Sequence, residues 1–406
     1  MKILYLSDDF PPEVLGGAGI IAHQEAIAMS KLGHEIAIIT TTRDLNKCGT
    51  FVENGLKVHR LYSSYAERWR AYISINNRKV VKQISQIINE FKPDIVHAHN
   101  IHSHISYAGL KVAKNSGARV LLTFHDLMAV SYGKVIKGSM SISDIGFRYN
   151  PFRNFFIKKY LGYADKLLAV SEAVSSILSN NGIKNIAVIH NGIEVRDWAI
   201  DEVKLKAFKS RLNLADTRFN LEGKKVIFFV GRISGAKGAF VALEALKKVR
   251  ESSDNAVLLI AGSSDSKGAM KMKERAHELN LEDAVIFTGW LAHEEMKYAI
   301  SAADIVAVLS LYVDPFPTVN LEAMACKKPV IGTKFGGTPE IVMDNVTGYI
   351  VDPGDVKETA IKMVGLLAND ARANEFGNAG YERVKKDFSL DEHVKSLLKW
   401  YDKRNE

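Results

Sequence analysis

The feature that most constrains the fold is an alternation of strand-length and helix-length segments that runs through the chain twice. Ile20–Leu32 has helical spacing and stops at Gly33, which fits a connecting helix. Such alternation implies a parallel sheet with helices on both faces. The apolar strand-length segments of the first series are Lys2–Ser7, Glu35–Thr41, Asp94–His99, Arg119–Phe124 and Asp165–Val170.

A second series of the same kind starts near Lys224. Its strand-length segments are Val226–Val230, Ala256–Ala261, Ala284–Thr288, Asp304–Leu309 and Pro329–Thr333. The helix-length segments between them are Lys237–Arg250, Lys267–Leu279 and His293–Ser301. Open α/β sheets bind ligands outside the carboxyl ends of their strands. We therefore predict an α/β fold of two Rossmann-like, doubly wound parallel-sheet domains that face a cleft.

The length of 406 residues supports two domains, because single hydrophobic cores stop growing at about 250–300 residues. We predict an N-terminal domain over residues 1–195 and a C-terminal domain over residues 196–385. Residues 386–406 are expected to form a helix that packs back toward the N-terminal domain. The boundary falls in the mostly polar stretch between Asn191 and Gly223.

The composition excludes several classes of protein. The only cysteines, Cys48 and Cys326, cannot form a disulfide framework or a zinc spacing, so a reducing, cytoplasmic location is expected. Met1–Phe10 is expected to be a buried first strand and not a signal peptide, and no apolar run approaches the roughly 18 residues of a membrane span. The net charge of +8 favours anionic partners. Because no nucleic-acid recognition motif accompanies it, we expect no nucleic-acid partner.

The segment Val230–Gly238 leaves a strand, turns on glycines and enters a helix near Lys237. Arg232 and Lys237 can both face one diphosphate from such a turn, and a helix N-terminus adds partial positive charge. The Walker pattern fails, because Ala236 precedes the lysine and Gly238 follows it. The alternative is a plain surface turn with two solvated cations.

Two further loops carry candidate groups. In Asp314–Cys326, Pro315 and Pro317 indicate a loop, and a helix is expected to begin near Val319 with Thr318 in the capping position. Glu322 then falls one turn into this helix, where it could accept both hydroxyls of a ribose or merely complement the helix dipole. The loop Pro11–Gly19 is glycine-rich but lacks the dinucleotide fingerprint, and taken alone it is a flexible turn.

Taken in order, the motifs of this chain resemble those of the retaining glycosyltransferases of family 4 (glycosyl transferases group 1), which have the GT-B architecture. The resemblance runs from Met1 to about Asp355. Beyond the three segments above, the motifs that carry it are Pro93–His99, Thr123–Asp126, Asn191–Ile193 and Gly336–Glu340.

The resemblance implies an acceptor-side N-terminal domain and a donor-side C-terminal domain. Glu322 would bind the ribose, and the loop with Trp290 would border the nucleobase. His125 and Asp314 would be the catalytic residues, with His125 near the reacting carbon and Asp314 on the donor sugar. The groups implied for the donor diphosphate are Gly16, Gly17, Arg232, Lys237 and the backbone N–H groups of Thr318 and Val319.

The chain departs from the family pattern at three places, and these put the sugar's identity in doubt more than the reaction. Asp314 stands where the family usually has Glu, and Pro317-Thr318 stands where Gly and an aliphatic residue are common. Ala261–Ser263 replaces a more glycine-rich turn. Pre-placed cations stabilise a diphosphate leaving group without metal, and no Asp-x-Asp motif lies in a suitable loop. We therefore expect no cofactor and no metal.

The implied function is transfer, with retention, of a sugar from a nucleotide-sugar donor to a glycan or lipid-linked acceptor in surface polysaccharide or glycolipid synthesis. We favour a UDP-sugar over a GDP-sugar. Alternatives on the same fold are a nucleotide-sugar epimerase, a phosphorylase and a non-catalytic nucleotide-sugar-binding subunit. A dinucleotide oxidoreductase is disfavoured, because its fingerprint and its ribose-binding acid are missing.

Two other signals have competing interpretations. His97, His99, His102 and His104 alternate as metal ligands could, but a strand end that carries the family motif explains the first pair. Phe147–Tyr160 and Tyr65–Arg78 are basic and aromatic. They are either half-buried helices with solvated charges or a peripheral contact with an anionic membrane, at its inner face and near the acceptor site.

Overall fold

The computed structural model describes residues 1–13, 16–131, 150–215 and 221–402, and side chains of the helical residues 213–215 are left aside. The chain divides into two compact units. The N-terminal unit comprises Met1–Gly192 together with the segment from Leu390 onward, and the C-terminal unit comprises Ile193–Ser389. None of the helices in these described ranges is long and apolar enough to cross a membrane.

The N-terminal unit is built on an eight-stranded sheet with the order β3-β4-β2-β1-β5-β6-β7-β8. Neighbouring strands are parallel except for the antiparallel β3–β4 pair. The strands are β1(Lys2–Ser7), β2(Glu35–Thr42), β3(Gly49–Glu53), β4(Leu56–Tyr62), β5(Ile95–His99), β6(Arg119–Phe124), β7(Lys166–Ala169) and β8(Ile186–Val188).

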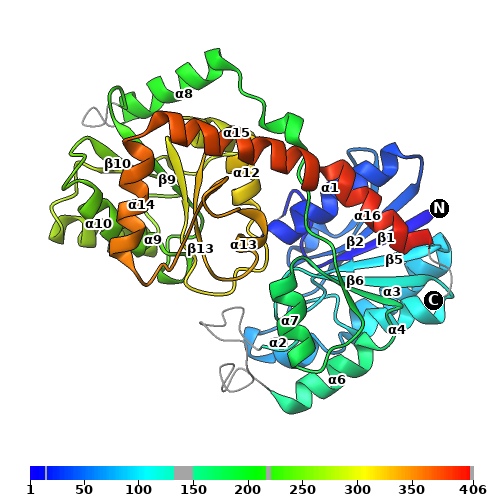
Figure 1. Cartoon of the computed structure of the whole chain (residues 1–406). Coiled ribbons are helices and arrows are strands. Elements are labelled where there is room, and N and C mark those ends of the chain that lie inside the picture. Colours follow the sequence, from blue (N-terminus) through cyan, green and yellow to red (C-terminus); the bar gives the residue numbers. More distant parts are fainter. Residues whose placement is uncertain (14–15, 132–149, 216–220, 403–406) are drawn as a thin grey trace. The chain divides into compact units, whose positions relative to one another are not determined.

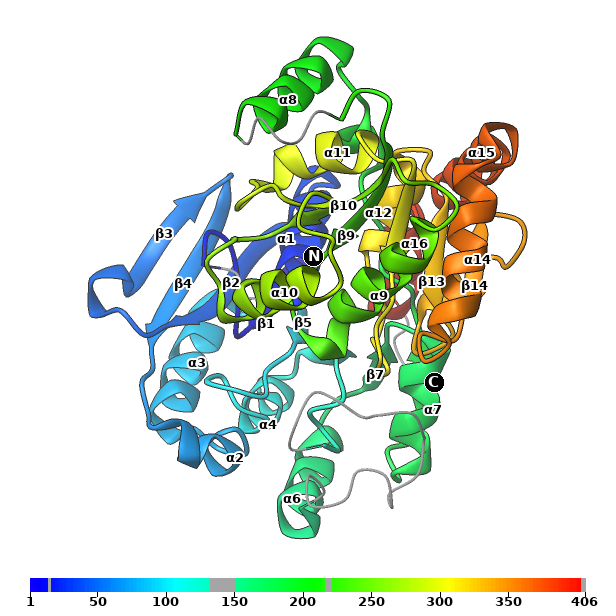
Figure 2. The same cartoon turned by 90° about the vertical axis from the view of Figure 1, so that its left-hand side faces the viewer.

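The β3–β4 hairpin, which extends from the sheet in Figure 2, was not predicted from the sequence. Its turn is Asn54-Gly55, and both residues have positive φ, 51° and 78°. Two positive φ angles are the requirement of a type I′ hairpin turn, and Asn-Gly is its strongest sequence signal. The hairpin could therefore have been predicted from the Asn54-Gly55 dipeptide.

Helices cover both faces of this sheet. α16 packs against α1 although the two lie at opposite ends of the chain (Figure 1). Met29 of α1 and Leu397 of α16 join Tyr5, Ile38 and Ile95 of the sheet in one buried cluster. The helices of the unit are α1(Gly17–Lys31), α2(Arg70–Ile73), α3(Arg78–Phe91), α4(Ala108–Asn115), α6(Pro151–Leu161), α7(Glu172–Asn180) and α16(Leu390–Asp402), with short 3-10 helices at Leu45–Lys47 and Glu67–Trp69.

The C-terminal unit is built on a six-stranded, wholly parallel sheet with the order β11-β10-β9-β12-β13-β14. β14 was not predicted, whereas the other five strands coincide with apolar segments named above. The strands are β9(Lys225–Val230), β10(Ala256–Ala261), β11(Val285–Phe287), β12(Ile305–Val308), β13(Val330–Thr333) and β14(Gly348–Val351).

α9 and α14 cover one face of this sheet (Figure 1), and their apolar side chains belong to the core cluster of the unit. Leu243 and Met363 pack there with Phe229 and Leu258. On another side, α8 lies beside α11 (Figure 2). The helices are α8(Glu202–Ala215), α9(Ala239–Val249), α10(Lys267–Glu278), α11(His293–Ser301), α12(Val319–Ala325), α13(Thr338–Ile341), α14(Val356–Leu367) and α15(Asp370–Asp387), with 3-10 helices η4(Val195–Trp198) and η5(Gly235–Lys237).

Two helix boundaries differ from the sequence-based expectation. Lys237 ends the 3-10 helix η5, and α9 begins only at Ala239. The final helix, expected from Asp387, is instead interrupted: α15 ends at Asp387 and α16 begins at Leu390.

The strand orders locate one switch point in each sheet. In the C-terminal unit, β9 is followed on one side by β10 and on the other by β12. In the N-terminal unit, β1 lies between β2 and β5 in the same way. Doubly wound sheets bind ligands outside the carboxyl ends of the strands at such points. The loops after β9, β12, β1 and β5 are therefore the expected ligand-binding loops.

Candidate functional site

The loop after β9 packs directly on the end of β12. Gly231 and Gly238 have φ angles of +133° and +82°, which favour glycine. A Cβ atom on Gly238 would lie 2.0 Å from the carbonyl oxygen of Leu309. Only glycine therefore lets this backbone approach, and the approach places Lys237 beside the loop that follows β12.

Lys237 and Asp314 form an ion pair at the switch point. Nζ of Lys237 lies 2.5 Å from Oδ2 of Asp314, and the Ser310 hydroxyl donates to the same oxygen over 3.0 Å. The Lys237 ammonium also lies 5.3 Å from the ring centre of Tyr312. Burial opposes the charge of Lys237, but Asp314 and Tyr312 outweigh burial and raise the pKa of Lys237. The residues expected on the diphosphate and on the sugar are thus bonded to each other.

The turn after β13 packs against the Asp314 loop and holds its backbone in place. The Gly337 N–H donates to the Asp314 carbonyl over 2.9 Å. Gly336 has a φ of +68°, and a Cβ there would lie 2.0 Å from the same oxygen. The Gly-Gly pair of the Gly336–Glu340 motif therefore positions Asp314, a role that the sequence did not reveal.

Thr318 occupies the N-cap position of α12 as predicted, but its side chain makes no capping hydrogen bond. Its backbone is already helical, with φ −59° and ψ −23°. Its hydroxyl donates instead to Oε1 of Glu322 over 3.0 Å. Burial raises the pKa of Glu322 to about 7, and the bond from Thr318 opposes that shift. Near neutral pH this half-buried carboxyl group therefore exists in both forms. Val319 begins the helix as predicted.

Arg232 and Trp290 follow the carboxyl ends of β9 and β11. Both side chains are exposed, and Trp290 is 86% exposed. Gly289, with a φ of +76°, turns the chain just before Trp290. An exposed indole beside strand ends is available to a planar ligand group.

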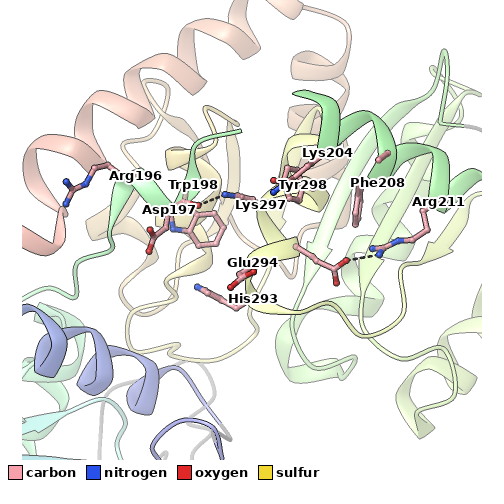
Figure 3. Close-up of a pocket in the computed structure, with 12 residues that line it drawn as sticks. Arg196, Asp197, Trp198, Lys204, Phe208, Arg211, His293, Glu294, Lys297 and Tyr298 are labelled. Atoms are coloured by element: carbon pink, nitrogen blue, oxygen red, sulfur yellow. Dashed lines mark hydrogen bonds and ion pairs between the residues drawn. The ribbon is translucent and has the colours of Figure 1, made fainter. Parts of the chain in front are cut away.

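The C-terminal unit also has a pocket of about 800 Å³ that contains none of the predicted donor-site residues (Figure 3). Two contacts link elements across it: Arg211 lies 2.7 Å from Glu295, and Lys297 donates to the Asp197 carbonyl over 2.9 Å. The pocket lies between η4, α8 and α11, and its lining consists of Arg196, Asp197, Trp198, Lys204, Ala207, Phe208, Arg211, His293, Glu294, Glu295, Lys297 and Tyr298.

In the N-terminal unit, Gly16 and Gly17 lie at the start of α1, after β1. Both are exposed, and a Cβ on either would meet no atom within 4 Å. Packing inside the unit therefore does not require glycine there, whereas Gly19 is required, since its Cβ would lie 2.7 Å from the Asp9 carbonyl. Val14 and Leu15 of this loop lie outside the described residues.

His125 follows β6 and is bonded to a buried neighbour. Its Nε2 lies 2.9 Å from Nδ1 of His99, the last residue of β5. Burial, followed by the influence of His99, lowers the pKa of His125 to about 3. His125 is therefore a neutral imidazole at physiological pH.

Glu25 of α1 and His393 of α16 complete this cluster, and the sequence analysis missed both. Glu25 is 1% exposed, and its Oε1 lies 2.8 Å from Nε2 of His393. Its Oε2 lies 3.3 Å from Nε2 of His99 and 3.6 Å from Nδ1 of His97. A charged residue on the buried face of the Ile20–Leu32 pattern was the available signal.

The four alternating histidines do not share one environment. One ligand atom each from Glu25, His97 and His99 lie within 4.8 Å of one another, an arrangement that could hold a metal ion. His102 lies instead 3.5 Å from Asp126. His104 bonds Ser63 over 2.9 Å.

Only some side chains of the basic, aromatic helix α6 are exposed to solvent. Phe152 and Phe155 are 64% and 65% exposed. Arg153, one of the basic residues of Phe147–Tyr160, is instead buried and donates to the Met128 carbonyl over 2.9 Å. Residues 147–149 of the stretch lie outside the described residues.

Models of known families match most of the chain. The model of Glycosyltransferase Family 4 matches residues 15–197, and that of Glycosyl transferases group 1 matches residues 214–383. An uncharacterized glycosyltransferase from Methanocaldococcus jannaschii is 27% identical over 99% of this chain and 98% of its own. The alpha-monoglucosyldiacylglycerol synthase of Streptococcus pneumoniae is 27% identical over 86% of this chain and 75% of its own.

Solved structures share the fold across the whole chain. Sucrose-phosphate synthase from Thermosynechococcus elongatus has a TM-score of 0.76 at 22% identity, covering 99% of this chain and 98% of that one. HepE from Anabaena in complex with UDP-glucose has a TM-score of 0.75 at 18% identity, covering 98% and 99%. The fold is that of the GT-B glycosyltransferases, and the chain belongs to the glycosyltransferases of family 4, the glycosyl transferases group 1.

Proposed function

We propose that this protein transfers a sugar, with retention of configuration, from a nucleoside-diphosphate sugar to a glycan or lipid-linked acceptor. The observation that carries the proposal is the Lys237–Asp314 pair at the switch point of the C-terminal sheet. UDP is favoured as the carrier, in line with the UDP-glucose complex of HepE. A lipid-linked acceptor is in line with the name of the Streptococcus pneumoniae relative.

The pair suggests how the donor is engaged. A diphosphate carries more negative charge than a carboxylate and competes with Asp314 for the Lys237 ammonium. Exposed Arg232 adds a second cation from the same loop. When Lys237 turns to the diphosphate, the Asp314 oxygen is released to accept a hydroxyl of the sugar. Cations already in place then stabilise the charge that develops on the leaving diphosphate, and we expect no metal requirement.

A thermal-shift screen against a panel of nucleotide sugars tests this proposal, because a ligand that binds only the folded state raises the unfolding temperature. We expect UDP-sugars to raise it more than GDP-sugars or ADP-sugars. Absence of a shift with every nucleotide sugar would overturn the proposal.

The alternatives differ in what they consume. An epimerase converts the sugar nucleotide with no acceptor, and a phosphorylase requires inorganic phosphate. A non-catalytic subunit binds the nucleotide yet shows neither hydrolysis nor transfer in any acceptor mixture. Product analysis of one radiolabelled donor, with and without acceptor extract and phosphate, separates these three outcomes from transfer.

The proposal includes peripheral contact with an anionic membrane through α6. Phe152 and Phe155 are exposed apolar side chains near Lys159, which is also exposed. An aromatic and basic helix face of this kind partitions into the interface of anionic bilayers. Co-sedimentation with vesicles should rise with the phosphatidylserine content and fall in Phe152→Ser/Phe155→Ser. Binding that is independent of anionic lipid would remove this part.

A further inference from the structure

The buried cluster of the N-terminal unit contains one group whose protonation the geometry fixes. Nδ1 of His393 lies 2.7 Å from the His190 carbonyl oxygen, and its Nε2 lies 2.8 Å from Oε1 of Glu25. A carbonyl and a carboxylate can only accept hydrogen bonds. Both nitrogens of His393 therefore donate, and His393 is an imidazolium paired with the Glu25 carboxylate.

The ionised state of Glu25 is consistent with its surroundings. Burial alone would raise its pKa, but the hydrogen bond and positive charge of His393, together with the hydrogen-bonding contact of a neutral His99, hold the pKa of Glu25 well below its usual value. One carboxylate and one imidazolium then balance. A second imidazolium at His99 would leave a buried charge without a counter-charge, which is costly.

His99 is therefore neutral, and its proton can be placed. Oε2 of Glu25 lies 3.3 Å from Nε2 of His99. Across the described part of the chain, neither buried atom forms a hydrogen bond of good geometry with any other group. Because a buried polar group is satisfied wherever it can be, Nε2 of His99 carries the proton and faces the carboxylate. Nδ1 of His99 is then left with a lone pair.

The lone pair of His99 determines the tautomer of the next ring. Nδ1 of His99 lies 2.9 Å from Nε2 of His125, and the two rings are stacked. Nε2 of His125 must donate across this contact. A neutral imidazole that is protonated on Nε2 has an unprotonated Nδ1.

We propose that Glu25 and His99 are positioning residues that hold His125 in its Nε2–H tautomer, so that His125 offers Nδ1 as a hydrogen-bond acceptor to a hydroxyl of the donor sugar. The part about the sugar rests on the proposed function. The part about the tautomer does not, because Glu25, His99 and His125 all belong to the N-terminal unit.

A metal ion held by Glu25, His97 and His99 is the competing explanation of the cluster. Two bonds of these residues disfavour it. Nδ1 of His97 already bonds the Tyr401 hydroxyl over 2.7 Å, and Glu25 already carries His393. A dication beside the His393 imidazolium would leave two uncompensated positive charges in the core.

Two-bond ¹H–¹⁵N correlation spectra of the full chain, labelled on the histidine ring nitrogens, test the proposal without any substrate. His125 is assigned by the loss of its signals in His125→Gln. We expect a protonated Nε2 and an unprotonated Nδ1 for His99 and for His125, and protons on both nitrogens of His393. An Nδ1–H tautomer at His125 would overturn the proposal, as would one equivalent of zinc retained through purification.

His99→Phe and His97→Phe form a matched pair of variants. Both residues are fully buried on β5, but His97 bonds Tyr401 and Thr123 and not His125. His99→Phe should produce mixed tautomers at His125 and lower kcat on the order of 10- to 100-fold, as outer-shell substitutions do. His97→Phe should lower the unfolding temperature similarly yet leave the His125 tautomer unchanged. Equal effects of both variants on the tautomer would contradict the proposal that Glu25 and His99 set the tautomer of His125, which we call the Glu25–His99–His125 relay.

The outcomes remain distinct if one variant does not fold or no donor is found. The wild-type spectrum alone decides the tautomer, and Glu25→Gln is a second way to disturb it. If the nucleotide-sugar panel gives no binding while His125 shows the Nε2–H tautomer, the proposed function fails and the relay stands. If a donor binds and His125 carries its proton on Nδ1, the relay fails and the function stands.

Discussion

Lys237 and Asp314 neutralise each other at the end of β12, so any anionic ligand that uses Lys237 exchanges one ion pair for another. The gain on binding is therefore a difference between two contacts, and Lys237 contributes less affinity than an unpaired cation would. Arg232 is exposed and does not have to give up an ion pair with Asp314 when it binds an anion. The two cations of one loop thus have different energetic roles.

Arg232→Ala should weaken binding of UDP about 10- to 100-fold, which corresponds to one lost charge-assisted hydrogen bond. Lys237→Ala should also weaken it, but by less, because Lys237 gives up its ion pair with Asp314 on binding. Binding of uridine should change far less. Lys237→Ala should also lower the unfolding temperature, because buried Asp314 loses its partner. Isothermal titration measures the affinities for UDP and uridine, and thermal unfolding measures the stability. Lys247→Ala, at the exposed end of α9, is the control. Equal losses for UDP and uridine would mean that neither residue binds phosphate.

Glu322 should make donor binding depend on pH. Its pKa in the folded protein is about 7, so below that pH the carboxyl group is protonated and can no longer accept two ribose hydroxyls. The affinity for UDP-glucose, whose phosphates do not titrate in this range, should fall as the pH is lowered from about 8 to about 6. In Glu322→Gln the affinity should be lower and independent of pH. A wild-type profile as flat as that of the variant would exclude this role.

The sign for stability is the opposite of that for binding. The folded-state pKa of Glu322 lies above the ordinary value of 4.5, so the unfolded state releases its proton first. Glu322 therefore contributes most to stability below pH 4.5, and this contribution is lost as the pH rises through about 7. Thermal unfolding of wild type and Glu322→Gln should diverge across this window.

At the scale of elements, the backbone contact of the β9 loop with the end of β12 builds the site. Gly238→Ala places a Cβ where the Leu309 carbonyl lies and forces a strained φ of +82°. We expect a loss of about 2–4 kcal/mol in the free energy of unfolding of the C-terminal unit. Gly235→Ala is the control, since a Cβ there meets no atom within 4 Å. Denaturant unfolding compares the two, and equal stability of the variants would show that the contact is not needed.

Burial differs between most of the strands that were predicted from the sequence and most of those that were missed. Central strands such as β1 and β10 are buried on both faces and read as continuous apolar runs. The missed strands β3, β8 and β14 lie at sheet edges, and no position of β3 or β8 is fully buried. β4 was missed as well although it is mostly buried, so burial does not explain its omission. An edge strand has only one neighbour and needs less apolar surface, so its pattern is weak.

The candidate site shows the same limit at the level of contacts. Lys237, Asp314 and Glu322 could be predicted as candidates because each follows a strand end within a motif. Glu25 and His393 were not found, because their bond joins residues 368 positions apart and no local pattern encodes it. Thr318 stands at the predicted N-cap, but its helical backbone angles differ from the extended ones of a side-chain cap, and its hydroxyl donates to Glu322.

At the scale of the whole molecule, the last helix belongs to the first unit. Val394, Leu397 and Tyr401 of α16 are buried in the N-terminal core, and Tyr401 bonds His97. Removing the chain from Leu390 onward should cost the N-terminal unit at least about 5 kcal/mol, from roughly 1.5–3 kcal/mol for each buried apolar side chain. The unpaired Glu25 carboxylate adds to this loss.

Hydrogen exchange followed by mass spectrometry measures where the loss falls. Protection should decrease in β1 and β5 and stay unchanged in β9 and β12, which belong to the other unit. Removal of residues 403–406 alone is the control and should change neither. A loss of protection that is equal in both units would contradict this division.

The continuity of the two units also fixes the order in which they can be completed on the ribosome. The C-terminal unit is one uninterrupted stretch, Ile193–Ser389, and has all its residues before α16 is translated. The N-terminal unit is begun first, yet it remains incomplete until α16 has been translated, since His393 and Tyr401 of that helix belong to it. A chain that ends before α16 would therefore carry a complete C-terminal unit and an incomplete N-terminal unit with exposed apolar surface. Apolar surface exposed in this way makes an incomplete chain prone to aggregation.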